Sequence, residues 1–170
     1  MPPKKLSAFH RGMHQVASTS AGAWFMARTQ HHLDRIVFSV SGGRTTMAGV
    51  LTGLSVVVLS AKGAKSGVIR DTPLLCIEDE AEPGVFAIVA SNFGQGHNPA
   101  WYYNLKANPQ ACCTLRGQSQ DYVATELEGD EYQRYWGYAL DTYMGFPHYK
   151  RRVGDRHIPI FVMKPVSAND

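Results

Sequence analysis

Six short strand-like runs separated by turn residues predict a mainly β protein of the α+β class, a small closed or partly split β-barrel with an N-terminal helical segment. The runs lie near residues 54–61, 72–78, 85–91, 111–117, 120–127 and 158–163. Turn residues lie between them at Gly63 and Gly67, at Glu82-Pro83-Gly84 and at Gly117-Gln118. A single helix is predicted between the third and fourth runs, which excludes a parallel sheet of alternating strands and helices.

The segment before the first strand has helical periodicity. Residues 8–38 are predicted to be helical, and Leu33, Ile36, Val37 and Val40 fall at i, i+3, i+4 and i+7, the apolar stripe of a helix. Gly42-Gly43 ends the segment. We therefore divide the 170 residues into an N-terminal helical segment, residues 1–45, and one barrel domain, residues 46–170.

Two helices are expected inside the barrel domain. Asn98 suits an N-cap and Pro99 the first helical position, after which Trp101, Tyr102 and Leu105 fall on one side and Asn108-Pro109 ends the helix. At least one of the two aromatic residues should lie in the core. A second helix, near 130–142, begins with Asp130-Glu131, and acidic residues favour a helix N-terminus.

Charge is unevenly placed along the chain. Residues 1–50 contain six Lys or Arg and one acid, a net charge of +5, whereas the remainder contains 11 Lys or Arg and 13 acids, a net charge of −2. Trp24, Phe25 and Met26 add an apolar patch to the basic segment. The simpler interpretation is that the basic residues form a solvated helix face and the apolar patch packs on the barrel. Peripheral contact with an anionic membrane surface is the alternative. We expect no nucleic-acid partner.

Cysteine and histidine usage favours a cytoplasmic protein without metal. Cys76, Cys112 and Cys113 form no C-x-x-C pair and fit reduced thiols, and adjacent strand residues such as Cys112 and Cys113 point to opposite faces. The adjacent His31 and His32 and the isolated His97 do not make a metal site. The first residues lead into no apolar signal segment, and the longest apolar run, 49–61, is too short to span a bilayer.

The loop from Gly63 to Leu74 predicts an anion site. It places glycines, Lys65, Ser66 and Arg70 between two strands, where backbone N–H groups and two cations can hold a phosphate or carboxylate. A polar surface turn is the alternative interpretation. A Walker loop is excluded, because Ala64 stands directly before the lysine and a strand rather than a helix follows.

The second glycine cluster does not predict a dinucleotide site. Gly94-Gln95-Gly96 begins like the dinucleotide-binding fingerprint, but Pro99 stands where the third glycine belongs. An anion loop on a β-hairpin is therefore favoured over a nucleotide loop on a Rossmann unit.

Four motifs together resemble the deazaflavin-dependent nitroreductase family, the split-barrel, FMN-binding-like oxidoreductases of actinobacteria that use coenzyme F420. They are Gly63-x-Lys65-Ser66-Gly67-x-x-Arg70-x-Thr72-Pro73-Leu74, then Val89-Ala90-Ser91, then Asn98-Pro99-x-Trp101-Tyr102-x-Asn104-Leu105-x-Ala107-Asn108-Pro109, then Arg156-x-Ile158-Pro159-Ile160. The resemblance covers about residues 36–165. It implies hydride transfer from reduced coenzyme F420 to an apolar small-molecule acceptor, a quinone, an enone or a nitroaromatic compound.

The resemblance also implies a set of site residues. Lys65 and Arg70 match positions that hold the phosphate and oligoglutamate tail of the coenzyme, with Lys62 and the N–H groups near Ser66 and Gly67 nearby. The cofactor-binding set is Lys62, Lys65, Ser66, Gly67, Arg70, Thr72, Pro73, Leu74, Ala90, Asn92, Pro99, Trp101 and Tyr102. Ser91, Tyr143 and Tyr149 are the expected catalytic hydrogen-bond donors, and with Phe146 they line the substrate side.

The chain departs from the family pattern at several positions. Ala64 stands where arginine is common, and Asn92 where some members have a basic residue. Phe146 replaces the middle one of three tyrosines found in some members, and it cannot donate a hydrogen bond. One extra residue lies between Tyr149 and Arg156. We expect these departures to affect the affinity for the coenzyme's oligoglutamate tail and the geometry of the residues over its deazaflavin ring.

Two other functions compete with this interpretation. An FMN-dependent split-barrel oxidoreductase would share the fold, and a non-catalytic carrier would hold a lipid or another apolar ligand. The cationic Lys65 and Arg70 loop favours a polyanionic ligand over an apolar one. The sequence leaves the oligomeric state open, since split barrels occur as monomers and as dimers.

Overall fold

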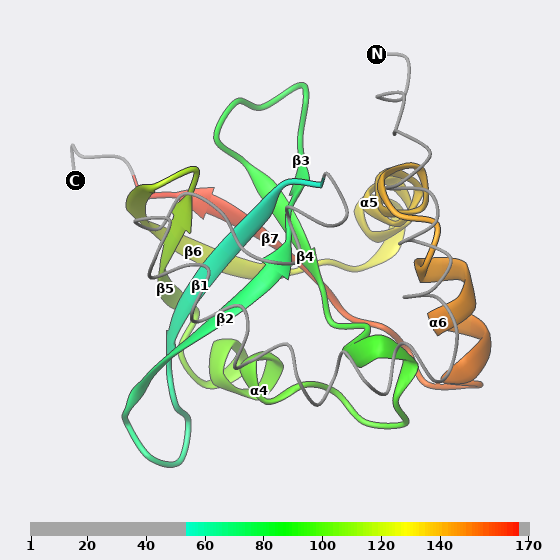
Figure 1. The fold of residues 1–170 in the computed structure, drawn as a ribbon, viewed down its shortest axis with the longest axis horizontal. Coiled ribbons are helices and arrows are strands. Elements are labelled where there is room, and N and C mark those ends of the chain that lie inside the picture. The colour runs from blue at the N-terminus through cyan, green and yellow to red at the C-terminus, as the bar shows by residue number, and fades with distance from the viewer. Residues whose placement is uncertain (1–53, 167–170) are drawn as a thin grey trace.

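The computed structural model describes residues 54–166, in which one antiparallel sheet of seven strands forms the core (Figure 1). The strand order is β2-β1-β5-β6-β7-β4-β3. The strands are β1 (Val56–Lys62), β2 (Ile69–Leu75), β3 (Ile77–Glu78), β4 (Phe86–Val89), β5 (Gln110–Leu115), β6 (Gln118–Glu126) and β7 (Ile160–Pro165). The predicted N-terminal helical segment and the division at residue 45 lie outside the described residues.

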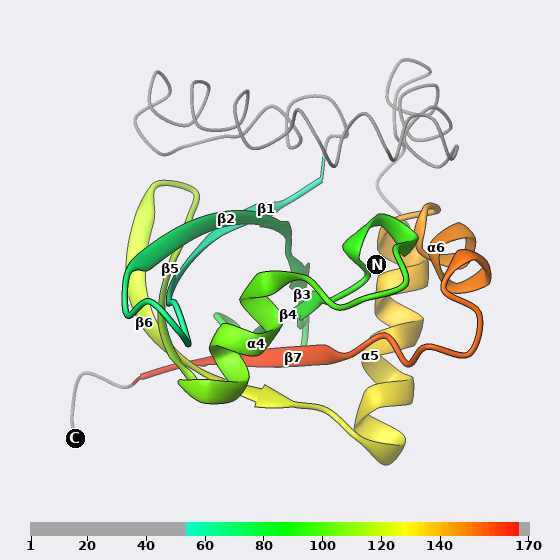
Figure 2. The same ribbon diagram turned by 90° about the horizontal axis from the view of Figure 1, so that it is seen from below.

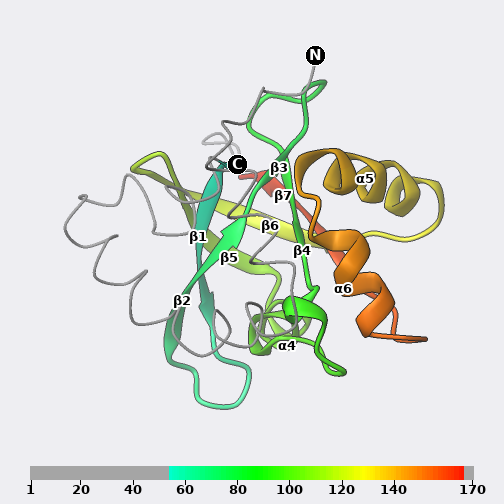
Figure 3. The same ribbon diagram turned by 45° about the vertical axis from the view of Figure 1, so that its right-hand side comes forward.

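Three helices and a 3-10 turn accompany the sheet. They are the turn η1 (Asn92–Gly94), α4 (Ala100–Ala107), α5 (Gly129–Thr142) and α6 (Phe146–Arg152). Figure 2 shows the sheet curled into a half-barrel with α4 lying across it, and Figure 3 shows α5 and α6 packed beside β3, β4 and β7. The expected split-barrel architecture is confirmed.

Residues 54–166 form two hydrophobic cores, one inside the barrel and one under α5 and α6, and strands β4 and β7 contribute to both. On β7, Phe161 and Met163 face the barrel interior, whereas Ile160 and Val162 face the layer of α5 and α6. Side chains alternate between the faces of a strand, so a strand buried on both faces reads as a continuous apolar run. β4 follows the same rule, with Ile88 in the barrel core and Ala87 in the helical core.

One predicted strand is two strands in the structure. The run 72–78 divides at Cys76, whose N–H donates to the carbonyl of Ser55 at 2.9 Å. Before this residue β2 pairs with β1, and after it β3 pairs with β4. The residues on either side of Cys76, Leu75 and Ile77, are both apolar, so the sequence does not show the change of pairing partner.

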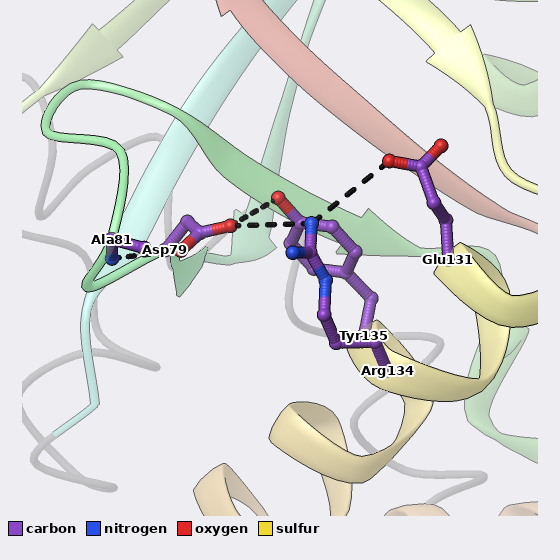
Figure 4. A network of polar contacts seen from close by, with 5 residues as sticks. All are labelled: Asp79, Ala81, Glu131, Arg134 and Tyr135. Carbon is purple, nitrogen blue, oxygen red and sulfur yellow. Dashed lines mark hydrogen bonds and ion pairs between the residues drawn. The ribbon is translucent and has the colours of Figure 1, made fainter.

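A buried carboxylate connects the β3–β4 turn to α5 (Figure 4). The Tyr135 hydroxyl donates to Asp79 Oδ2 at 2.6 Å, the Ala81 N–H donates to Oδ1 at 2.9 Å, and the Arg134 guanidinium lies 3.8 Å from Oδ2. The hydrogen bond from Tyr135 is the main cause that lowers the pKa of Asp79. Three donors compensate the burial of this charge, as a buried carboxylate requires.

Candidate functional site

The β1–β2 hairpin is fixed from within and from α4. The Gly63 N–H donates to Val68 O at 2.9 Å, and the Gly67 N–H donates to Gly63 O at 2.8 Å. Gly67 has a φ of 68°, which glycine adopts readily. The Ala64 N–H donates to Asn104 Oδ1 on α4 at 3.0 Å. The turn itself therefore uses the Gly67 N–H, and of the N–H groups expected near Ser66 and Gly67 this one is already paired.

The hairpin presents cations to solvent. Lys62, Lys65 and Arg70 are all exposed, and none of them pairs with a carboxylate of residues 54–166. The neighbouring Asp71 instead accepts a hydrogen bond from Ser60 Oγ at 2.7 Å. Within the same range no acceptor meets the N–H groups of Lys65 and Ser66. The tip of the hairpin therefore offers positive charge and backbone donors to an anion.

Thr72, Pro73 and Leu74 lie on β2, opposite Leu59, Val58 and Val57 of β1. Leu74 packs against the barrel core. β2 is an edge strand of the sheet, and an edge strand tolerates the proline because no further strand needs its missing N–H. These residues connect the tip of the hairpin to the barrel core.

Ser91 lies where β4 ends, and it is only 8% exposed. Its carbonyl accepts hydrogen bonds from the Gly94 N–H and from Arg156 Nη2, both at 2.9 Å. Ala90 before it is fully buried, and the Ala90 N–H donates to Pro159 O at 2.8 Å. No other residue in the described range hydrogen-bonds the Ser91 hydroxyl, so this group can donate to a ligand.

The turn after Ser91 has a left-handed backbone. Asn92, Phe93 and Gly94 have φ values of 48°, 55° and 79°, and each non-glycine residue in this region costs about 1–2 kcal/mol. A Cβ at Gly94 would lie 3.2 Å from Tyr149 Cα, so only glycine fits there comfortably. The Asn92 amide donates to His97 O at 2.9 Å. Asn92 thus closes its own loop, which limits the coenzyme contact expected of it.

The start of α4 differs from the prediction. Pro99 is the residue before the helix, and no side chain caps the N-terminus. The Asn98 Oδ1 atom accepts a hydrogen bond from Arg156 Nη1 instead of serving as the N-cap. Arg156 lies 58 residues further along the chain, a contact that local sequence rules cannot show.

The two aromatic residues of α4 have different surroundings. Trp101 is 6% exposed and packs edge-to-face against Phe161 at 6.2 Å between ring centroids, which confirms it as a core residue. Tyr102 is partly exposed, and its hydroxyl donates to Glu126 Oε1 at 3.5 Å. Lys106 Nζ donates to the other oxygen of Glu126 at 2.7 Å.

The structure brings Tyr143, Phe146 and Tyr149 together, as their spacing predicts. All three are at most 4% exposed, and the hydroxyl oxygens of the two tyrosines lie 3.2 Å apart. The Phe146 ring meets Tyr143 edge-to-face at 5.4 Å and Tyr149 at 6.3 Å. The Phe93 ring lies 6.2 Å from Tyr149, so the turn after Ser91 touches this aromatic cluster.

Both phenols of the cluster are protonated near pH 7, as a tyrosine ordinarily is, and burial strengthens this preference. Burial raises the pKa of Tyr143 and, more strongly, that of Tyr149, while the nearby Arg152 opposes both shifts. Phenols that stay neutral near pH 7 remain hydrogen-bond donors. The cluster is therefore suited to stabilise a developing negative charge without being ionised itself.

These parts lie along one edge of the molecule in the order hairpin, α4, η1 and α6 (Figure 1). Asn104 joins the hairpin to α4, and Phe93 joins η1 to α6. The sequence did not single out Asn104 or Arg156 as site residues. Nor did it single out Gly145, where an added Cβ would overlap the Tyr143 ring. Asn104 and Arg156 belong to the resembling motifs, but their contacts with Ala64 and Asn98 lie 40 and 58 residues away.

Residues 54–166 contain neither a candidate metal site nor a candidate membrane-spanning helix. No group of three or more His, Cys, Asp or Glu is placed to hold a metal ion. Within this range, too, none of the helices combines the length and apolar character needed to cross a membrane.

Known proteins similar to this chain include F420H(2)-dependent reductases. A Mycobacterium tuberculosis protein provisionally named an F420H(2)-dependent quinone reductase is 30% identical over 118 residues, 69% of this chain and 96% of its own length. The solved structure of an F420-H2 dependent reductase, FDR-A, has 37% identity and a TM-score of 0.58 over 64% of this chain and 93% of its own. A structure described as a domain-swapped dimer has 33% identity and a TM-score of 0.59, covering 85% of this chain and all of its own. The family model for F420H(2)-dependent quinone reductase matches residues 29–165, and the chain therefore belongs to this family.

Proposed function

We propose that this chain reduces a quinone at the edge formed by the hairpin, η1 and α6, with reduced coenzyme F420 as the hydride donor. The proposal that this edge is the active site depends on one observation: its two ends differ in chemistry. Exposed cations without carboxylate partners in residues 54–166 lie at one end, and three hydroxyl groups of low exposure lie at the other. Family membership supplies the reaction class, and this arrangement supplies the roles.

The residues at the hairpin fit an anionic coenzyme. Lys62, Lys65 and Arg70 would hold the phosphate and the oligoglutamate tail, with the N–H groups of Lys65 and Ser66 as further donors. The wall beside the ring would come from β2, the end of β4 and α4. Its members would be Thr72, Pro73, Leu74, Ala90, Asn92, Pro99, Trp101 and Tyr102.

The residues near η1 and α6 fit the acceptor. When bound, the reduced coenzyme supplies a hydride, and negative charge then develops on the acceptor oxygen. Ser91, Tyr143 and Tyr149 would donate hydrogen bonds to that oxygen, and the buried Phe146 would exclude water. The same donors suit enones and nitroaromatic compounds, so we extend the proposed acceptor range to both.

Coenzyme F420 is favoured over FMN by the family match, and a carrier function is disfavoured by the cationic hairpin. A yellow protein as purified would support FMN instead. A fatty acid or isoprenoid in native mass spectra, without turnover under any reductant, would support a carrier.

The decisive experiment mixes the purified protein with reduced coenzyme F420 and menadione and follows the return of the oxidised coenzyme's absorbance. Protein-dependent oxidation is expected. Tight coenzyme binding without oxidation would retain the site and exclude menadione-like acceptors. Failure of both binding and turnover would overturn the proposed function.

We also propose a cytoplasmic location with peripheral membrane contact through the basic, aromatic N-terminal segment, whose residues lie outside the described range. Apolar quinones reside in membranes, which supports such contact. The full chain should partition onto anionic liposomes more than a version that lacks residues 1–35. Equal partitioning would refute the contact.

A further inference from the structure

The two ends of the loop between β4 and α4 are held by one side chain that approaches from the segment before β7. Arg156 Nη2 donates to Ser91 O at 2.9 Å, and Arg156 Nη1 donates to Ala90 O at 3.3 Å and to the side-chain oxygen of Asn98. Ala90 and Ser91 begin the loop, and Asn98 ends it. A single guanidinium therefore closes the loop that carries Ser91.

The loop needs such closure because its backbone is strained. Asn92, Phe93 and Gly94 are all left-handed, and a phenylalanine rarely adopts this conformation. Such a conformation persists only where the surroundings hold it in place. The hydrogen bond from the Asn92 amide to His97 O holds the inner part of the loop, and the Arg156 contacts hold the outer part.

The partners of Arg156 are unusual for an arginine. All are neutral oxygens, and no carboxylate of residues 54–166 pairs with the guanidinium. Its Nε atom is buried without a hydrogen-bond partner in this range, and burial lowers the pKa of the side chain. Placing an unpaired cation there is costly, and only a planar fork of several donors can reach the oxygens of Ala90, Ser91, Asn98 and His157 at once.

We propose that Arg156 is a positioning residue for quinone reduction, which holds the strained loop so that the Ser91 hydroxyl faces the acceptor. The proposal rests on the proposed role of Ser91 and adds to it a residue that touches neither coenzyme nor acceptor. A misplacement of about 1 Å at a reacting centre can cost about a hundredfold in rate, so loss of the fork should appear in turnover.

The test uses Arg156→Lys in the full-length protein, with Arg116→Lys as the matched control. Lysine keeps the charge and loses the fork, whereas Arg116 is an exposed arginine on the β5–β6 turn, paired with Glu78. We expect kcat with menadione to fall about 10- to 100-fold in Arg156→Lys, while the KM and the Kd of the oxidised coenzyme change less than about threefold. The control should match the wild type.

A double-mutant cycle shows whether the effect acts through Ser91. In a Ser91→Ala background, Arg156→Lys should lower kcat by no more than about twofold. Asn98→Ala, which removes one of the four accepting oxygens, should give a smaller loss than Arg156→Lys and serves if the latter variant fails to fold. Full turnover in Arg156→Lys, or equal losses with and without the Ser91 hydroxyl, would overturn the proposal.

Hydrogen exchange separates this proposal from the proposed function, because it needs neither coenzyme nor acceptor. The N–H groups of Gly94 and Gln95 donate to Ser91 O and Asn92 O within the loop. Their exchange should accelerate at least about tenfold in Arg156→Lys, while the hairpin amide of Gly67 exchanges as in the wild type. Unchanged exchange would refute the loop closure even if the enzyme is active. Accelerated exchange in a protein without quinone turnover would retain the closure and reject the proposed function.

Discussion

Substitution of Gly145 by alanine tests how the aromatic cluster is held. A Cβ built on Gly145 overlaps ring carbons of Tyr143 and lies 2.7 Å from the hydroxyl oxygen of that residue. The backbone at Gly145 is right-handed, with φ of −77° and ψ of −25°, so alanine fits the backbone itself. The steric contact with Tyr143 therefore determines the outcome.

The magnitude follows from two opposing effects. Replacing glycine by alanine at a compatible backbone position stabilises a protein by about 0.4–1 kcal/mol. Overpacking a buried site costs about 1–3 kcal/mol, and displacing the Tyr143 ring also loses its hydroxyl contact with Tyr149, about 1 kcal/mol. We expect Gly145→Ala to lower the free energy of unfolding by about 1–3 kcal/mol.

The assay compares urea unfolding and menadione turnover for Gly145→Ala and Gly137→Ala. Gly137 lies within α5, and a Cβ there meets no atom within 4 Å, so alanine should stabilise that variant by about 0.5–1 kcal/mol. We expect kcat to fall in Gly145→Ala and to stay unchanged in the control. A Gly145→Ala protein with wild-type stability and turnover would refute the placement of the Tyr143 ring.

Three further predictions address the acceptor, the coenzyme and the fold. Phe146→Tyr should raise turnover of nitro substrates more than that of quinones, because it adds a donor to the cluster, and a drop in both would show that Phe146 serves packing. Arg70→Ala should weaken coenzyme binding about tenfold in a fluorescence titration, increasingly so at low salt, whereas Arg116→Ala should not. Tyr135→Phe should lower the free energy of unfolding at pH 7 by about 1–2 kcal/mol, since it removes the main donor to Asp79. Because the folded-state pKa of Asp79 is lowered, its stabilisation is present at neutral pH and is lost as the pH falls below about 4. The acid-induced loss should be smaller in Tyr135→Phe, and equal acid sensitivity would contradict this role.

The sequence predicts β1, β4 and β7 because these strands are largely buried on both faces and therefore appear as apolar runs, whereas β6 alternates buried and exposed residues. The sequence does not locate the break at Cys76, where the chain changes its pairing partner within the apolar stretch 74–77. Local rules also predict Asn98 as the helix N-cap, whereas in the structure its side-chain oxygen accepts a hydrogen bond from Arg156. Helix and strand patterns report local preference, and contacts across many residues require the folded chain.

The candidate site divides in the same way. The motifs identify Lys65, Arg70 and Ser91, and the three-residue spacing identifies the aromatic cluster, because these signals lie within short segments. These patterns do not predict the contacts that hold the site together. Asn104 Oδ1 accepts a hydrogen bond from the Ala64 N–H, and Gly145 leaves room for the Tyr143 ring, two roles that local patterns do not reveal.

The double-sided burial of β7 restricts where acceptor preference can change. Ile160 and Val162 support the helices that carry the aromatic cluster, while Phe161 and Met163 of the same strand complete the barrel. A change of side-chain volume at any of these four positions therefore disturbs one core or the other. Variants selected for a new acceptor should accumulate substitutions in η1, α6 and the segments around them, and leave the shared strand unchanged.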